Sequence, residues 1–167
     1  MGKNTIKLKK YLDIINEIEA AAAITPGMVL ELTSAGKVKA HSSAGGNAPA
    51  YIALEDELQG NSIEDAYANG DKVQVWFGVP GEEALLILAD GQNVAIGDLL
   101  ESNGAGYLQK HVADVESFES NEAGSITVYP KQIICQALEA KNLSDSSGAE
   151  SSDGVLGYNK RIKVRIV

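Results

Sequence analysis

The fold of this chain is decided by the stretch Ile24-Thr-Pro-Gly-Met-Val-Leu-Glu-Leu-Thr-Ser-Ala-Gly-Lys-Val-Lys-Ala-His41. It aligns without gaps with Val94-Ala-Ile-Gly-Asp-Leu-Leu-Glu-Ser-Asn-Gly-Ala-Gly-Tyr-Leu-Gln-Lys-His111, 70 residues further on. The identical positions are Gly27/Gly97, Leu30/Leu100, Glu31/Glu101, Ala35/Ala105, Gly36/Gly106 and His41/His111. Self-similarity of this kind indicates a repeated structural unit.

Two shorter matches follow the first one in the same order. Ala53-Leu54-Glu55 matches Ala137-Leu138-Glu139 at an offset of 84, and Lys72-Val-Gln-Val75 matches Lys163-Val-Arg-Ile166 at an offset of 91. Order is kept while the spacing grows. The pattern predicts a pseudo-repeat over residues 24–79 and 94–167 with loop insertions in the second copy, although shared hairpin chemistry also produces short matches.

Each copy has the sequence pattern of β structure. Gly27 or Gly97 predicts a turn, Ala-Gly predicts the close of a hairpin, and an alternating segment such as residues 37–40 follows. Further strands are predicted over residues 50–54, 72–79, 83–89, 132–138 and 161–167. Short strands with Gly-rich turns predict an all-β domain over residues 24–167, built as a compact small barrel or sandwich from the duplicated hairpin unit.

Two segments lie outside this pattern. Apolar side chains recur every three or four residues over residues 8–23, which predicts a short amphipathic helix that Pro26-Gly27 ends. Residues 1–23 are therefore expected to form a basic N-terminal arm and this helix. Residues 142–154 are rich in Ser, Asp and Gly, and they predict an exposed flexible loop between the last two strands.

Charge is distributed unevenly along the 167 residues, whose formal net charge is −9. Residues 1–10 and 160–167 each carry four basic side chains and no acid, so all 23 Asp and Glu lie between them. The acidic balance argues against nucleic-acid binding. The basic ends either pair with the acidic body or dock on an acidic partner surface.

Length and composition bound the class of protein further. The chain is long enough for one domain to bury roughly 70% of the surface that it exposes when unfolded. Its longest strongly apolar stretches, residues 20–24 and 84–89, fall far short of the roughly 20 residues that span a bilayer. Acidic residues interrupt any signal-peptide core near the N-terminus, so synthesis and folding in the cytoplasm are expected. The single thiol, Cys135, allows no internal disulfide.

Candidate chemical groups give no active site, so we assign no catalytic, cofactor-binding or metal residue and expect no enzyme activity. His41 and His111 occupy equivalent repeat positions, which shared hairpin geometry explains. The acids of residues 55–57 and 64–65 are read as solvated loop charges, and residues 145–153 resemble a calcium loop only superficially. Cys135 is expected to be buried and inert. The strand aromatics offer either a sugar-binding platform or packing in the core or at a subunit interface; they are Tyr51, Trp76, Phe77 and Tyr107.

An ordered series of strings resembles the head decoration, or cement, proteins of tailed bacteriophages. The strings are Ile24-Thr-Pro-Gly-Met-Val-Leu-Glu-Leu, Ala50-Tyr-Ile-Ala-Leu-Glu, Gly70-Asp-Lys-Val-Gln-Val, Gly97-Asp-Leu-Leu-Glu-Ser-Asn-Gly-Ala-Gly-Tyr-Leu, Ala137-Leu-Glu and Lys163-Val-Arg-Ile. They cover roughly residues 24–140 and the last strand.

The resemblance implies a β-tulip fold and a homotrimer that binds the major capsid protein at local threefold axes of the mature shell. It also implies a place on the capsid exterior, a stabilising role without cofactors, and no membrane partner. Such proteins often add an N-terminal arm to the shell. The corresponding residues here are Lys3, Asn4, Thr5, Ile6, Lys7, Leu8, Lys9, Lys10, Tyr11 and Leu12.

Other functions stay open on the sequence alone. A head-fibre base or tail component built on a similar barrel has the same pattern. A carbohydrate-binding or cell-surface-binding module is the alternative from a different class, with the strand aromatics in its groove. An enzyme of unknown type is the third.

Overall fold

The computed structural model describes residues 15–113, 129–144 and 160–167. These residues form short antiparallel strands and one 3-10 turn, which confirms the predicted all-β class and the compact, barrel-like architecture. The elements are β1 (Ile15–Glu19), β2 (Leu30–Leu32), β3 (Val38–Ala40), β4 (Tyr51–Ala53), η1 (Glu57–Gln59), β5 (Lys72–Phe77), β6 (Glu83–Ile87), β7 (Asn93–Val94), β8 (Leu99–Ser102), β9 (Leu108–Lys110), β10 (Ile133–Ala137), β11 (Lys141–Asn142) and β12 (Arg161–Ile166). The described part of the chain holds no helix long and apolar enough to cross a bilayer.

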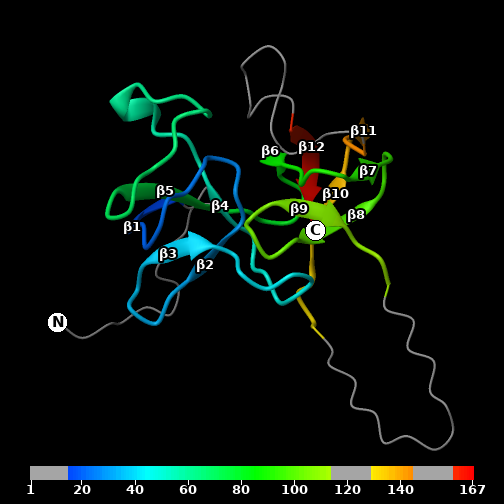
Figure 1. The fold of residues 1–167 in the computed structure, drawn as a ribbon, viewed down its shortest axis with the longest axis horizontal. Helices are drawn as coiled ribbons and strands as arrows, with labels where there is room; N and C mark the ends of the chain where they lie inside the picture. The colour runs from blue at the N-terminus through cyan, green and yellow to red at the C-terminus, as the bar shows by residue number, and fades with distance from the viewer. Residues whose placement is uncertain (1–14, 114–128, 145–159) are drawn as a thin grey trace, which may run out of the picture.

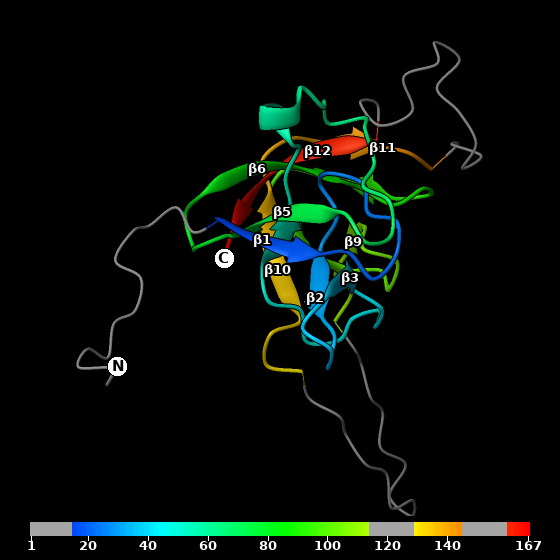
Figure 2. The same cartoon turned by 90° about the vertical axis from the view of Figure 1, so that its left-hand side faces the viewer.

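The strands form a three-stranded sheet, β1-β5-β4, and a five-stranded sheet, β6-β12-β10-β8-β9. Two small pairs, β2-β3 and β11-β7, complete the structure. In Figure 1 the first half of the chain lies on one side of the molecule, and β6 to β12 lie on the other; Figure 2 views the molecule from the side of the first half, with β1 in front. The five strand segments predicted between residues 50 and 167 all appear as strands, each trimmed by one or two residues at its ends.

The two halves share one pairing order. Val29 bridges to Ile52, which links β2-β3 to β4 and gives the order β1-β5-β4-β2-β3, matching β6-β12-β10-β8-β9 in the second half. The registers agree as well: Ala53 faces Val75 in one half, and Ala137 faces Val164 in the other. The last strands therefore correspond at an offset of 89, so the offset of 91 taken from the sequence is wrong.

The structure overturns the predicted helix where it describes those residues. Residues 15–19 form β1 and pair with β5, from Ile15 opposite Trp76 to Glu19 opposite Lys72. Ile18 packs against an apolar cluster, while Glu17 is exposed. Neighbouring side chains on opposite faces are what a strand produces. The open side of β5 supplies a ladder of backbone hydrogen bonds, and this tertiary pairing outweighs a short helical period. Residues 8–14 of the predicted helix lie outside the described residues.

Two apolar clusters form an interlocked core. The smaller cluster belongs to the first half but includes Ile87 of β6, which is 7% exposed. The larger cluster belongs mainly to the second half but includes Val29, Ile52 and Trp76. Each half therefore completes the core of the other, and the described strands form one packed body.

The predicted loop over residues 142–154 begins later than the sequence suggests. Asn142 ends β11 opposite Asn93, and the half-buried Leu143 packs against the larger cluster. This contact of Leu143 anchors the short pairing of β11 with β7 to the core. Residues 145–154 lie outside the described residues.

Asp98 makes the fold sensitive to acid. Its carboxylate pairs with Lys110 at 2.8 Å and accepts the Ala95 N–H at 2.8 Å. These contacts, that of Lys110 above all, hold the pKa of Asp98 below its usual range. A carboxyl group with a lowered folded pKa stabilises the protein above its unfolded pKa, and this contribution disappears as the pH falls through the folded pKa.

We expect the melting temperature to fall as the pH drops below about 4, and this acid dependence to be weaker in Asp98→Asn. The amide still accepts the Ala95 N–H but has no proton to take up. Thermal unfolding followed by circular dichroism, from neutral pH to about pH 2, measures the difference. The same acid dependence in both proteins would contradict the assignment.

Candidate functional site

The histidines and their polar neighbours have structural roles. His111 Nδ1 lies 2.6 Å from the carboxylate of Glu101, and His41 contacts the Ser102 hydroxyl through Nδ1 and the Asn47 carbonyl through Nε2, both at 2.9 Å. The backbone N–H groups of both histidines donate to equivalent hairpin carbonyls. No group of three or more His, Cys, Asp or Glu in the described residues is placed to hold a metal ion.

The acidic segments chosen from the sequence cap turns. Asp56 accepts the Gln59 N–H at the start of η1, and Asp65 accepts both the N–H and the hydroxyl of Ser62. These hydrogen bonds use the carboxylates of Asp56 and Asp65 within their own turns. The candidate calcium loop over residues 145–153 lies outside the described residues.

Cys135 is buried on β10, as predicted. Burial in apolar surroundings raises the pKa of its thiol to about 12. The thiolate that would react or bind a metal is therefore absent at neutral pH.

The strand aromatics do not form a flat platform. Tyr51 and Phe77 pack edge to face with their ring centroids 4.5 Å apart, and both lie against the smaller core cluster. Tyr107 packs against the same cluster, whereas Trp76 is 8% exposed and belongs to the larger one. All four aromatics therefore pack on the apolar clusters, with Tyr51, Phe77 and Tyr107 partly buried at the edge of the smaller one.

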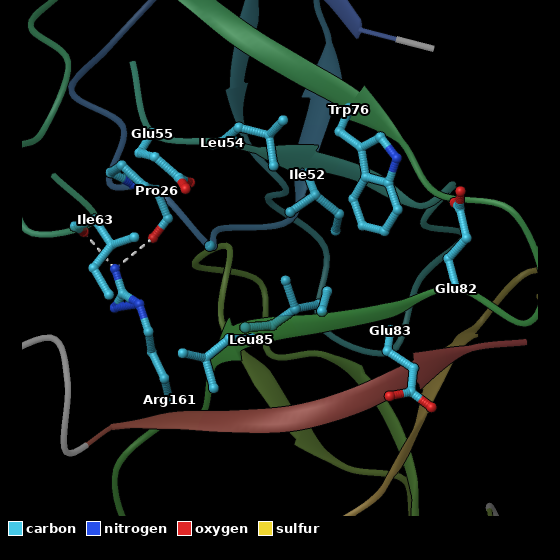
Figure 3. Close-up of a pocket in the computed structure, with 14 residues that line it drawn as sticks. Pro26, Ile52, Leu54, Glu55, Ile63, Trp76, Glu82, Glu83, Leu85 and Arg161 are labelled. Atoms are coloured by element: carbon cyan, nitrogen blue, oxygen red, sulfur yellow. Dashed lines mark hydrogen bonds between the residues drawn. The ribbon is translucent and has the colours of Figure 1, made fainter. Parts of the chain in front are cut away.

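A groove with a volume of about 680 Å³ lies between the two halves. Its two walls come from the β4–β5 side and from β6, as Figure 3 shows. We call it the β6 groove; its lining residues are Pro26, Gly27, Ile52, Ala53, Leu54, Glu55, Ile63, Trp76, Glu82, Glu83, Ala84, Leu85, Leu86 and Arg161. No sequence pattern pointed to this groove, because it arises from how the halves pack.

Arg161 closes one end of the β6 groove. Its side chain is 2% exposed, and its guanidinium donates to the carbonyl oxygens of Pro26, at 2.9 Å, and of Ile63 (Figure 3). These hydrogen bonds tie β12 to two loops of the first half. Arg161 therefore fixes the groove wall rather than presenting a free charge to a ligand.

The candidate capsid-binding residues 3–12 lie outside the described residues. The structure does fix where they join the body, since β1 begins at Ile15 opposite Trp76. The basic segment thus enters the sheet one strand away from the β6 groove.

Together these observations define an all-β domain whose described residues form a groove between the two halves and no cluster of metal ligands. No family model matches the sequence, and no curated protein matches it. One similar solved structure is the N base of the head fibre protein gp8.5 of bacteriophage phi29, with a TM-score of 0.52 and 13% sequence identity. The similarity covers 93% of this chain and 94% of that chain. At this identity it shows a shared fold.

Proposed function

We propose that this protein is a non-enzymatic structural component of a phage head, bound to the exterior of the mature capsid. The observation that carries the proposal is the shared fold with a phage head fibre base over nearly the whole of both chains. The described residues add a packed body with a groove suited to protein segments and no metal-ligand cluster. Binding at many equivalent shell sites would stabilise the assembled state by mass action.

The finer form of the proposal is a decoration role. The protein would bind the major capsid protein as a homotrimer at local threefold axes, with residues 3–12 as its shell contact. The four lysines of this segment supply positive charge that complements an acidic shell surface and fixes orientation. The acidic body, which holds all 23 Asp and Glu outside the basic ends, favours solubility of the decorated particle.

A head-fibre base is the second candidate, since the similar solved structure is one. Both roles place the protein on the head surface, and they differ in what it carries. Electron microscopy of particles with and without the protein separates them: fibres that disappear with the protein support the fibre base, and compact knobs support decoration.

The arm is tested by replacing Lys3, Lys7, Lys9 and Lys10 with Gln. We expect this variant to lose most of its co-sedimentation with capsids, because it loses the charge that pairs with the shell, and to keep its melting temperature. The matched control replaces four lysines outside the arm with Gln; they are Lys39, Lys72, Lys131 and Lys141. Equal capsid binding by the arm variant and wild type, or by a variant lacking residues 2–12, would contradict the arm's role.

A further inference from the structure

One side of β6 is open over Glu83 and Leu85. The Leu88 N–H donates to the Lys160 carbonyl at 2.7 Å, and the Ile166 N–H donates to the Glu82 carbonyl at 2.9 Å. In an antiparallel pair, the residues that hydrogen-bond to the partner strand alternate with residues that do not. The backbone N–H and C=O groups of Ala84 and Leu86 therefore point toward β12, and those of Glu83, Leu85 and Ile87 point away from it. The Ile87 N–H donates to Gly27 at 3.2 Å. No described residue is hydrogen-bonded to the outward N–H and C=O of Glu83 and Leu85.

This open edge faces the β6 groove, whose chemistry suits an extended segment with apolar and basic side chains. Ile52, Trp76 and Leu86 give the groove an apolar floor, and Leu85 beside them is 43% exposed. Glu55, Glu82 and Glu83 line it as well; Glu83 is paired with Arg165 at 2.8 Å, and the cation among the lining residues is Arg161. An added strand would complete the β6 ladder and place Lys side chains near the acids.

The N-terminal arm of this chain has that pattern. In Ile6-Lys7-Leu8-Lys9, the strand period of two puts the apolar side chains on one face and the lysines on the other. The arm joins the body at Ile15, opposite the groove residue Trp76. Its 14 residues span up to roughly 45 Å when extended, which is ample to turn back across one strand.

We propose that residues 3–12 dock in the β6 groove of their own chain as a strand added to the open edge of β6. The docking stands without the proposed function. One consequence does rest on the proposed function: the groove holds the arm in the free protein, and the capsid shell competes with the groove for the same segment.

The chain offers a clean optical test. Trp76 is its single tryptophan, and Cys135 is buried with a thiol that does not ionise at neutral pH. A bimane label on Thr5→Cys is quenched by contact with tryptophan. In the full-length protein we expect weaker bimane emission with Trp76 present than in the same labelled chain carrying Trp76→Phe. Equal emission from the two proteins would overturn the proposal.

Groove variants test the mode of docking. Leu85→Pro removes an outward N–H without touching the ladder to β12, and Glu55→Lys reverses a groove charge. Both should restore the emission, whereas Glu57→Lys, the same change at an exposed glutamate that does not line the groove, should not. Circular dichroism melting verifies that each variant folds. Quenching that Leu85→Pro and Glu55→Lys leave unchanged would overturn docking at this edge.

Mixing and capsid experiments separate the remaining outcomes. Quenching that appears when labelled Trp76→Phe chains are mixed with unlabelled wild type would place the arm in a neighbouring copy and overturn docking within one chain. Capsid co-sedimentation of the same labelled protein is read independently. Capsid binding without quenching would overturn the docked arm but support the proposed function. Quenching without capsid binding would support the docked arm but contradict the proposed function.

Discussion

Replacement of Leu100 by alanine is expected to lower the free energy of unfolding by about 2–5 kcal/mol. Leu100 is 0% exposed at the centre of β8, where it faces Lys110 on β9 and Cys135 on β10. Truncation removes buried apolar surface and leaves a cavity among strands whose backbone is fixed on both sides. The neighbouring strands cannot close such a cavity without breaking ladder hydrogen bonds, so the cost should lie well above that of a surface change.

Leu58→Ala is the matched control, because Leu58 is the same residue type at 89% exposure. We expect its effect to stay within about 0.5 kcal/mol. Urea unfolding followed by circular dichroism and by Trp76 fluorescence gives both values. Similar stabilities for the two variants would mean that the β8 region is not packed as described.

Gly106→Ala should be the second strongly destabilising change, and Gly36→Ala should be milder. The two glycines close equivalent hairpins with φ of +79° and +76°. Alanine carries the left-handed backbone cost of about 1–2 kcal/mol at both. At Gly106 the added Cβ also lies 3.0 Å from Ala40 Cβ and 3.2 Å from the Val29 carbonyl oxygen, whereas nothing lies within 4 Å at Gly36.

The excess loss at Gly106 should therefore be about 1–3 kcal/mol, the usual cost of overpacking. The same unfolding experiment measures the difference between Gly106→Ala and Gly36→Ala. Because both glycines have nearly the same φ, the backbone strain is similar in the two variants and drops out of the difference. If both variants lose equal stability, the contact between the two hairpins is looser than the structure gives.

Most of the β architecture could be predicted because it depends on local patterns. Gly-rich turns followed by alternating residues located both hairpins, and the apolar run at residues 83–89 located β6. β1 could not be predicted in this way, because the apolar residues around it recur every three or four positions, which favours a helix, and only pairing with β5 makes residues 15–19 a strand. The predicted offset of the last strand was wrong for a related reason. Basic or polar residues alternate with Val or Ile in both strands, so the two sequences also match after a shift of two residues, and identity alone does not fix the register.

In the candidate site, too, some features follow from the local sequence and others arise only when the chain packs. The burial of Cys135 follows from residue type, because an isolated thiol in an apolar strand segment is usually buried. The β6 groove does not, because its walls come from residues 26–27, 52–55, 76 and 82–86, and these meet only when the two halves pack. Arg161 illustrates the point: in sequence it belongs to a basic C-terminal run, and in the structure it is buried against two carbonyls of the first half.

The most direct test of the proposed role is to determine the oligomeric state of the purified protein and then its co-sedimentation with undecorated phage capsids. We predict a homotrimer that pellets with expanded capsids and stays in the supernatant with unexpanded precursors. A monomer that pellets with neither would contradict the proposed role on the phage head.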